Sequence, residues 1–244
     1  MNWQRPYLLY MKGGLGNQLF QLCAGTTIAD EIGCGILIRP VMATHHSDIF
    51  YFDNLFRNWS HLLAAGNVPT AVSMHGYYQD YRIFEDRSSR FVDQLDWTGF
   101  DNISRYGEVD NSIFIHVRGG DYLQPGFRDI HHVDLQQYYK NALARCKDVT
   151  HAYVFTNDKA YLESIDECFA DIRHTVVSGN PEITDLYLMS QCAKGGIAAN
   201  STFSWWGLYL DHTRKHMMLP SKWFTNDKNA EGLYFPEAQR VSVI

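Results

Sequence analysis

The chain has 244 residues, of which 45% are hydrophobic and 20% charged, and its net charge is −6 at pH 7. This composition is ordinary for a globular protein, and the length suits one large domain or two lobes of roughly 100–130 residues each. The negative charge excludes the basic surface that binds a nucleic-acid backbone, so we expect no nucleic-acid partner. Any phosphate site must be local, built from a few arginines and backbone N–H groups.

The cysteines and the N-terminal segment bear on the compartment. Five cysteines are scattered through apolar segments without a Cys-x-x-Cys pair: Cys23, Cys34, Cys146, Cys168 and Cys192. An odd, scattered set is typical of reduced core thiols, which favours a cytoplasmic protein over a disulfide-linked or zinc-binding one. The apolar run Tyr7–Met11 is far shorter than the roughly 20 residues of a membrane span, so we expect no membrane segment.

Short apolar runs alternate with amphipathic segments, as in parallel strands joined by crossover helices. The first half predicts strands over Tyr7–Met11, Gly35–Ile38 and Val72–His75, and a helix over Gln18–Ile32. The stretch Thr44–Pro69 is aromatic-rich and irregular, and Asp86–Asn111 is polar and patternless. We place a lobe boundary near the end of the polar stretch, which gives lobes 1–108 and 109–244.

The second half alternates more regularly. Its apolar runs predict strands over Ile113–Val117, Ala152–Thr156, His174–Val177, Gly196–Ala199 and Met217–Leu219. The segments between them predict helices over Asp134–Lys147, Lys159–Phe169 and Glu182–Ala193, and a further helix ending at Leu210. This alternation predicts a complete Rossmann-like lobe.

A glycine-rich turn, Gly13-Gly-Leu-Gly-Asn-Gln-Leu-Phe20, lies between the first predicted strand and helix. Backbone N–H groups at such a position bind anions, which makes Gly14 and Gly16 candidate phosphate contacts. Leu19 replaces the third glycine of the dinucleotide fingerprint, which disfavours a dehydrogenase, and there is no Walker lysine. The alternative is a turn used only for tight packing; the polar side chains of Asn17 and Gln18 argue against it.

The most informative stretch is Ser112–Tyr122, where an apolar strand ends in His116, Arg118 and Asp121. Ligands of α/β proteins bind at the carboxyl ends of strands. Arg118 offers a permanent positive charge and a fork of donors that matches phosphate oxygens. Gly119 and Gly120 let backbone N–H groups approach a phosphate. The alternative is a strand end with a satisfied histidine and a surface Arg–Asp pair.

Polar residues end two further predicted strands. Asp158 could accept hydrogen bonds from a ribose or a base, or it could cap the next helix. Asn200, Ser201 and Thr202 are small donors that open a helix and suit phosphate oxygens. Trp206 in the following turn is expected to pack in the core.

A metal site has little support. No Asp-x-Asp occurs, and the pairs His45-His46 and His131-His132 lack carboxylates at ligand spacing. We therefore expect no metal and no resident cofactor.

These motifs, in this order, resemble those of the family-11 glycosyltransferases, the α-1,2-fucosyltransferases. The family motifs Gly-Gly-Leu-Gly-Asn-Gln, His-x-Arg-Arg-x-Asp-Tyr and Asn-Ser-Ser-Phe-Ser-Trp-Trp-Gly correspond here to Gly13–Gln18, His116–Tyr122 and Asn200–Gly207. The resemblance implies an α/β, GT-B-like fold with two Rossmann-like lobes facing a cleft. It also implies GDP-fucose as donor substrate and no metal requirement.

The resemblance further implies roles for individual residues. Arg118 would grip the donor diphosphate, and His116 and Asp185 would lie near the nucleoside. Asn17 would face the sugar from the other lobe. Four residues would surround the diphosphate: Ser201, Thr202, Phe203 and Ser204.

The expected reaction is inverting transfer of L-fucose from GDP-fucose to the 2-hydroxyl of a terminal galactoside on a glycan acceptor. Asp121 is the first candidate for the base and Asp158 the second. One departure from the family is Gly119, which stands where the motif has a second arginine; Arg128 or Lys12 could compensate for it. The alternatives are a transferase for another GDP-sugar or acceptor, and a non-catalytic protein that binds a nucleotide sugar or glycan.

Overall fold

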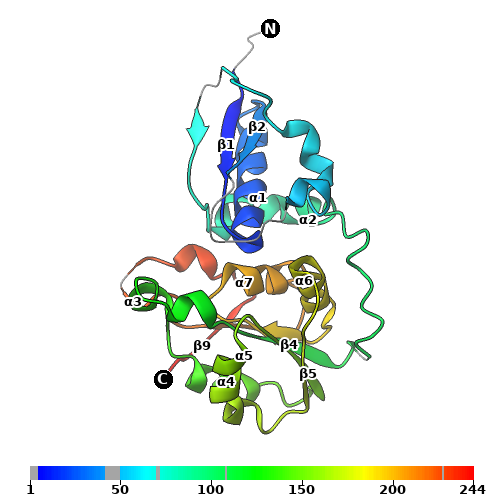
Figure 1. The fold of residues 1–244 in the computed structure, drawn as a ribbon, viewed down its shortest axis with the longest axis vertical. Helices are drawn as coiled ribbons and strands as arrows, with labels where there is room; N and C mark the ends of the chain where they lie inside the picture. Colours follow the sequence, from blue (N-terminus) through cyan, green and yellow to red (C-terminus); the bar gives the residue numbers. More distant parts are fainter. Residues whose placement is uncertain (1–4, 42–49, 70–71, 108, 227) are drawn as a thin grey trace. The chain divides into compact units, whose positions relative to one another are not determined.

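The computed structural model describes residues 5–41, 50–69, 72–107, 109–226 and 228–244. The chain divides into two units, Met1–Gly99 and Phe100–Ile244, each with its own parallel sheet (Figure 1). The expected boundary between residues 108 and 109 lies within unit 2. Tyr106 belongs to unit 2 because its backbone oxygen accepts a hydrogen bond from the Tyr153 hydroxyl at 2.9 Å and the two rings pack edge to face.

Unit 1 has a three-stranded sheet in the order β2-β1-β3, formed by β1 (Tyr7–Met11), β2 (Ile36–Pro40) and β3 (Ser73–Met74). Helix α1 (Leu15–Glu31) packs closely on it, since a Cβ at Gly25 would lie 2.7 Å from Leu9 Cδ2. Strand β1 is confirmed at its predicted residues. Helix α1 begins earlier than predicted because Gly13, at φ +85°, makes the turn and Gly14 is the N-cap.

The rest of unit 1 consists of short helices. These are η1 (Tyr51–Asp53), η2 (Arg57–Leu62), η3 (Tyr81–Ile83), η4 (Glu85–Arg87) and α2 (Ser88–Val92). Residues 44–49 of the predicted irregular region, including His45-His46, lie outside the described residues. The prediction that Asp86–Asn111 lacks regular structure is wrong at α2, which buried Phe91 anchors against Trp59.

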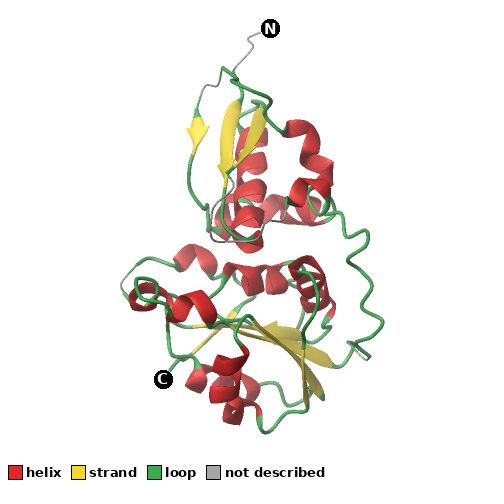
Figure 2. Ribbon diagram, in the orientation of Figure 1, coloured by secondary structure: helices red, strands yellow, loops and turns green. Residues whose placement is uncertain are grey.

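Unit 2 has a six-stranded parallel sheet in the order β6-β5-β4-β7-β8-β9, with helices on both faces (Figure 2). Its strands are β4 (Ser112–Val117), β5 (His151–Thr156), β6 (His174–Val176), β7 (Gly195–Ile197), β8 (His216–Pro220) and β9 (Gln239–Val241). Its α-helices are α3 (Arg128–His131), α4 (Gln136–Leu143), α5 (Lys159–Ser164), α6 (Glu182–Gln191) and α7 (Thr202–Tyr209). Three short helices complete it: η5 (Gly120–Leu123), η6 (Asp166–Phe169) and η7 (Glu231–Leu233).

Strand β4 is central in this sheet and buried on both faces. Ile113, Ile115 and Val117 belong to the core cluster that includes residues of α4 and α5. Phe114 faces α7, because a Cβ at Gly207 would lie 3.2 Å from its ring. Since side chains alternate along a strand, His116 shares the α7 face. The carboxyl end of β4 therefore presents its polar groups between β5 and β7.

Most of the predicted elements of unit 2 are confirmed, with shorter helices. The predicted helix Lys159–Phe169 divides into α5 and η6. The final strand β9 was not predicted, because it has only three residues and two of them are exposed. The five cysteines are free thiols. Among the described residues, no helix combines the length and hydropathy that crossing a membrane requires.

Candidate active site

Arg118 follows β4 directly and is held in place by two neighbours. Its Nη2 lies 2.6 Å from Asp121 Oδ1, and its guanidinium lies over the Tyr122 ring, 5.0 Å from the centroid. The Tyr122 hydroxyl donates to the backbone oxygen of Asn200 at 3.2 Å, which connects the arginine to the residues that begin α7. The guanidinium is thus held at the carboxyl edge of the sheet with one-fifth of its side chain exposed.

Two buried nitrogen atoms at this edge have no hydrogen-bond partner among the residues that the structure describes: Arg118 Nε and His116 Nδ1. Burial, and after it the charge of Arg118, lowers the pKa of His116 to about 3, so the imidazole is neutral at pH 7. The imidazole packs against Phe203 of α7, 5.8 Å between ring centroids. Unpaired buried polar groups are costly, which favours a polar ligand at this position.

The Gly119-Gly120 turn is fixed by side chains that follow β5. Gly119 N donates to Asn157 Oδ1 at 3.1 Å, and Gly120 N donates to Asp158 Oδ2 at 2.9 Å. Asp158 also caps α5, since its Oδ1 accepts from Tyr161 N. The hydrogen bonds from Gly120 and Tyr161 lower the pKa of Asp158. Both carboxylate oxygens therefore have partners in the chain, which is the capping alternative that the sequence left open.

The structure explains why residue 119 is glycine. A Cβ built there would lie 2.8 Å from Asp158 Cβ and 3.0 Å from Tyr161 Cβ. An arginine side chain does not fit without displacing the Asn157–Asp158 segment. Of the two residues named as possible substitutes, Arg128 begins α3 in unit 2, and Lys12 Nζ lies over the Tyr77 ring in unit 1.

The start of α7 is a second polar feature at the same edge. Ser201 is its N-cap residue, and no side-chain hydrogen bond caps the helix there. Asn200 is buried, and its Nδ2 donates to the backbone oxygens of His131 and Trp223, both at 2.8 Å. Asn200 therefore fixes the loop that leads into α7, and the N-terminus of a helix is a favourable position for an anion.

Ser204 and the adjacent tryptophans belong to the interior. Ser204 is fully buried, and its hydroxyl lies 3.3 Å from Ser201 O, so this placement does not support direct contact with a donor. Trp205 and Trp206 are fully buried, as expected for Trp206. Trp205 Nε1 donates to Leu233 O at 2.6 Å.

Asp185, in the first turn of α6, lies in a separate polar network. Its Oδ1 accepts from Asn180 Nδ2 at 2.7 Å, and Asn180 also donates to the Tyr106 hydroxyl at 2.7 Å. Arg105 donates to Asn180 Oδ1 and to Ser178 O. Burial raises the pKa of Asp185 to about 6, against the opposing effects of Asn180 and Arg105. Arg105 and Asn180 were not predicted as site residues. The sequence pointed to Asn180 only through the Ser178-Gly-Asn-Pro turn, and it gave no signal for Arg105.

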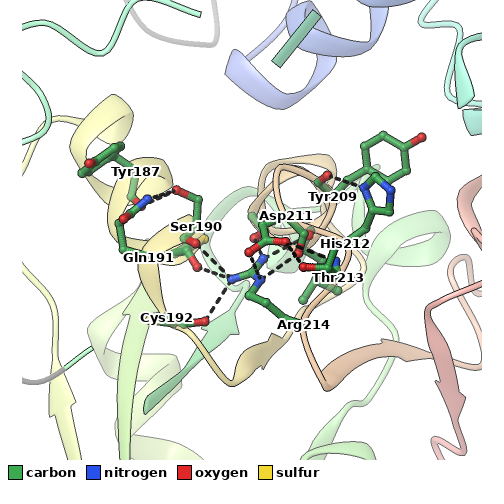
Figure 3. Close-up of polar contacts among 12 residues, drawn as sticks. Tyr187, Ser190, Gln191, Cys192, Tyr209, Asp211, His212, Thr213 and Arg214 are labelled. Atoms are coloured by element: carbon green, nitrogen blue, oxygen red, sulfur yellow. Dashed lines mark hydrogen bonds and ion pairs between the residues drawn. The ribbon is translucent and has the colours of Figure 1, made fainter. Parts of the chain in front are cut away.

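The buried Arg214 connects the C-terminal ends of α6 and α7, away from Asp185 and Thr202 at their N-terminal ends (Figure 3). Arg214 Nη1 donates to Met189 O at 2.8 Å and Cys192 O at 3.1 Å, and Nη2 donates to Gly207 O at 2.5 Å and Leu208 O at 3.0 Å. The last carbonyls of a helix lack partners within the helix, so one guanidinium satisfies both C-termini. This contact sets the relative position of the two helices that carry Asp185 and Thr202.

In unit 1 the glycine-rich turn is held from inside. Gln21 is fully buried, and its side chain bonds to Lys12 N, Lys12 O and Asn17 O at 2.7–2.9 Å. Gly14 is partly exposed at the helix start, and Gly16 is buried in the first turn. Asn17 Oδ1 accepts from Gln79 Nε2 at 2.8 Å, so the turn and the Gly76–Gln79 segment are connected.

The predicted residues thus form groups within each unit. Unit 2 brings together His116, Arg118, Asp121, Phe203 and the start of α7. Asp158 supports the Gly119-Gly120 turn, and Asp185 lies in its own polar network. Among the described residues there is no cluster of three or more His, Cys, Asp or Glu side chains that could hold a metal ion. His131 of the predicted pair instead stacks on Tyr122.

Two units, each with a parallel sheet and helices packed on it, make up a GT-B-like fold. Among solved structures, the chain is similar to NodZ, an α-1,6-fucosyltransferase from Bradyrhizobium whose crystals were soaked with GDP-fucose. The TM-score is 0.51 at 13% identity, over 85% of this chain and 92% of that one. At this identity the likeness establishes the fold alone.

The model of glycosyl transferase family 11 matches residues 56–237, and the chain therefore belongs to this family. The match includes His116–Tyr122 and Asn200–Gly207 and leaves Gly13–Gln18 outside. Two Escherichia coli relatives are the O-antigen biosynthesis glycosyltransferase WbnK, 34% identical over 51% of this chain, and an alpha-1,2-colitosyltransferase, 27% identical over 67%. The alignments cover 43% and 60% of those proteins, so the chain spans about half the length of the curated relatives it matches.

Proposed function

We propose that the protein is an inverting glycosyltransferase that moves L-fucose from GDP-fucose to the 2-hydroxyl of a terminal galactoside, without a metal. Family membership supports glycosyl transfer, and the resemblance of the motifs supports this donor and linkage. The scattered thiols support a cytoplasmic location.

The proposal rests on the guanidinium of Arg118, which Asp121 and Tyr122 hold in place while one of its nitrogen atoms lacks a hydrogen-bond partner among the described residues. Its Nε is buried without a partner among the described residues, and Tyr122 connects it to the start of α7. A diphosphate would satisfy this donor and the backbone N–H groups of the helix N-terminus together. Asn17 is proposed to face the sugar of the donor, and the N–H groups of Gly14 and Gly16 are proposed as further phosphate contacts.

In the proposed reaction the acceptor oxygen attacks the anomeric carbon of fucose while the bond from that carbon to the diphosphate oxygen breaks. GDP leaves with the bonding electrons, so stabilising its developing negative charge is the main catalytic task. Arg118, Ser201 and Thr202 supply that stabilisation. The proton of the attacking hydroxyl passes to a carboxylate.

Asp121 remains the proposed base. Its Oδ1 accepts a hydrogen bond from Arg118, and within the described residues the other oxygen has no hydrogen-bond partner, so it can accept a proton. Asp158 is the weaker candidate, because both of its oxygens accept backbone hydrogen bonds.

A second donor follows from the relative that is named an alpha-1,2-colitosyltransferase. Colitose is the 3-deoxy analogue of fucose, so a site for one sugar differs from a site for the other by the groups around one hydroxyl. The third possibility is a non-catalytic protein that binds a nucleotide sugar or glycan.

The test is incubation with GDP-fucose, lactose and EDTA, followed by measurement of released GDP, product mass and linkage by NMR. We expect GDP release matched by lactose fucosylated on the galactose 2-hydroxyl. A parallel reaction with GDP-colitose compares the two donors directly.

Each other result contradicts a stated part of the proposal. GDP release without product would mean the wrong acceptor, and activity only before EDTA treatment would mean that a metal is needed. GDP binding without release from either donor would favour the non-catalytic alternative.

A further inference from the structure

Unit 1 contains a cavity of about 590 Å³ that the proposed reaction does not use. It is lined by the last turns of α1, the start of β2, η2, η4 and α2. Volumes of roughly 300–1,000 Å³ are typical of small-molecule sites. All of its lining residues belong to unit 1, so the cavity is complete within one unit.

The cavity lies at the opposite edge of the sheet from the glycine-rich turn. Gly35 and Ile36 line it at the amino end of β2, whereas Gly13 follows the carboxyl end of β1, and the two strands are parallel. Helix α1 has 17 residues and carries Asn17 in its first turn; Thr27 and Asp30, near its other end, line the cavity. At 1.5 Å per residue this helix separates the two places by about 15–20 Å.

The charged groups at the cavity favour an anion. Arg87 pairs with Asp30, with Nη1 3.2 Å from Oδ2, and both side chains are exposed. Arg90, in α2, also lines the cavity and is exposed. Arg90 has no ion pair within the part of the chain that the structure describes. Two guanidinium groups against one carboxylate leave a local positive charge on a chain whose net charge is −6.

The remaining lining groups favour a sugar ring over a simple ion. Trp59 and Phe91 are largely buried, pack together with ring centroids 5.1 Å apart, and form an apolar wall of the cavity. Asn58, Gln94 and Thr27 add amides and a hydroxyl to the lining, although Asn58 Nδ2 already donates to Gln94 O at 2.8 Å; their oxygen atoms can accept hydrogen bonds from sugar hydroxyls. A guanidinium pairs with a carboxylate through its planar fork.

We infer that this cavity binds an acidic sugar unit, one that carries a carboxylate, at a site separate from the reaction. The carboxylate pairs with Arg90 and Arg87, and the ring lies against the wall of Trp59 and Phe91. The inference does not depend on the donor or on the reaction proposed above.

The test is ligand-observed NMR titration of the whole chain with methyl β-D-glucuronide, with GDP present in excess. Methyl β-D-glucoside is the neutral control and inorganic phosphate the simple anion. We expect saturable binding of the glucuronide, at least tenfold weaker binding of the glucoside, and no displacement by GDP or by equimolar phosphate. Arg90→Gln should weaken glucuronide binding at least tenfold.

Arg145→Gln is the matched control, since Arg145 is exposed in unit 2. It should bind the glucuronide as the unaltered protein does, and Arg90→Gln should leave GDP release from GDP-fucose and lactose unchanged. Displacement by GDP, equal binding of glucoside, competition by equimolar phosphate, or an Arg90→Gln protein that binds normally would each overturn the inference. None of these outcomes depends on whether fucose is the transferred sugar.

Discussion

Arg118 combines three properties that lysine cannot reproduce together: a fork of donors, a planar group over Tyr122, and a buried Nε. Lysine would keep the charge and lose the fork and the stacking. We expect Arg118→Ala to reduce transfer by about 10²–10³-fold or more and Arg118→Lys to recover only a small part of the loss.

The measurement for Arg118 is initial rate with saturating GDP-fucose, alongside circular dichroism to confirm folding. Arg145→Ala is the control and should transfer normally. Near-normal turnover by a folded Arg118→Ala protein would remove Arg118 from the mechanism.

Gly119 is set by packing, so restoring the family's second arginine should harm the protein. Because a Cβ there meets Asp158 and Tyr161 at 2.8–3.0 Å, we expect Gly119→Arg to lower the free energy of unfolding by about 1–3 kcal/mol without tightening GDP binding. Gly14→Ala is the stability control, since no atom lies within 4 Å of the added Cβ. Denaturant unfolding and GDP titration measure both effects; tighter GDP binding by Gly119→Arg would show that the missing charge matters.

Asp185 should make the folded protein less stable as pH rises. Its pKa is raised to about 6 in the folded protein and is near 3.8 in the unfolded chain. Between these values the folded state holds a proton that the unfolded state has lost, so stability falls as pH rises from about 4 to about 6. Asp185→Asn should remove this loss and be more stable than the unaltered protein at pH 7 by on the order of 1 kcal/mol.

The Asp185 effect is measured as the difference between the two proteins in urea unfolding at pH 4.5 and pH 7, which cancels the contributions of other carboxyls. A difference that does not change with pH would contradict the raised pKa.

At the scale of elements, α6 and α7 depend on one side chain for their relative position. Arg214 is 6% exposed and donates to carbonyls at the ends of both helices. Its removal leaves several buried carbonyls unpaired, each a cost of roughly 1–3 kcal/mol. We expect Arg214→Met to destabilise the protein by at least about 3 kcal/mol, measured by denaturant unfolding.

Arg240 provides the comparison for Arg214. It pairs with Glu231 through two hydrogen bonds, but both side chains are largely exposed. Arg240→Met should therefore cost less than about 1 kcal/mol. Equal effects at the two positions would mean that the buried contacts of Arg214 add nothing to stability.

At the scale of the whole molecule, unit 2 has its own sheet and core and contains the proposed donor-diphosphate contacts. We expect residues 100–244, expressed alone, to unfold cooperatively and to be stabilised by GDP, as any ligand that binds the folded state does. Residues 109–244 should be less stable, because they lack Tyr106 and the Arg105 contacts to the Ser178–Asn180 turn. Thermal unfolding with and without GDP compares the two; equal stability would place the boundary where the sequence suggested.

The sequence by itself determined the class of fold and the sheet edge at which the candidate site residues gather. Apolar runs such as Ile113–Val117 define buried parallel strands, because burial on both faces leaves no polar alternation. Arg118 and the start of α7 could be placed at one edge of the sheet, because the carboxyl ends of parallel strands lie at the same edge. Local chemistry was enough for these conclusions.

Only the tertiary structure decided which polar group partners which. Asp158 occupies both oxygens in capping and loop contacts, Gly119 is required by the approach of Asp158, and Arg214 joins two helix ends. Each depends on residues more than twenty positions away or on an adjacent element, and a sequence pattern carries no distance between such residues. The cavity of unit 1 could not be predicted for the same reason: residues of five elements line it, and none of these elements has a motif of its own.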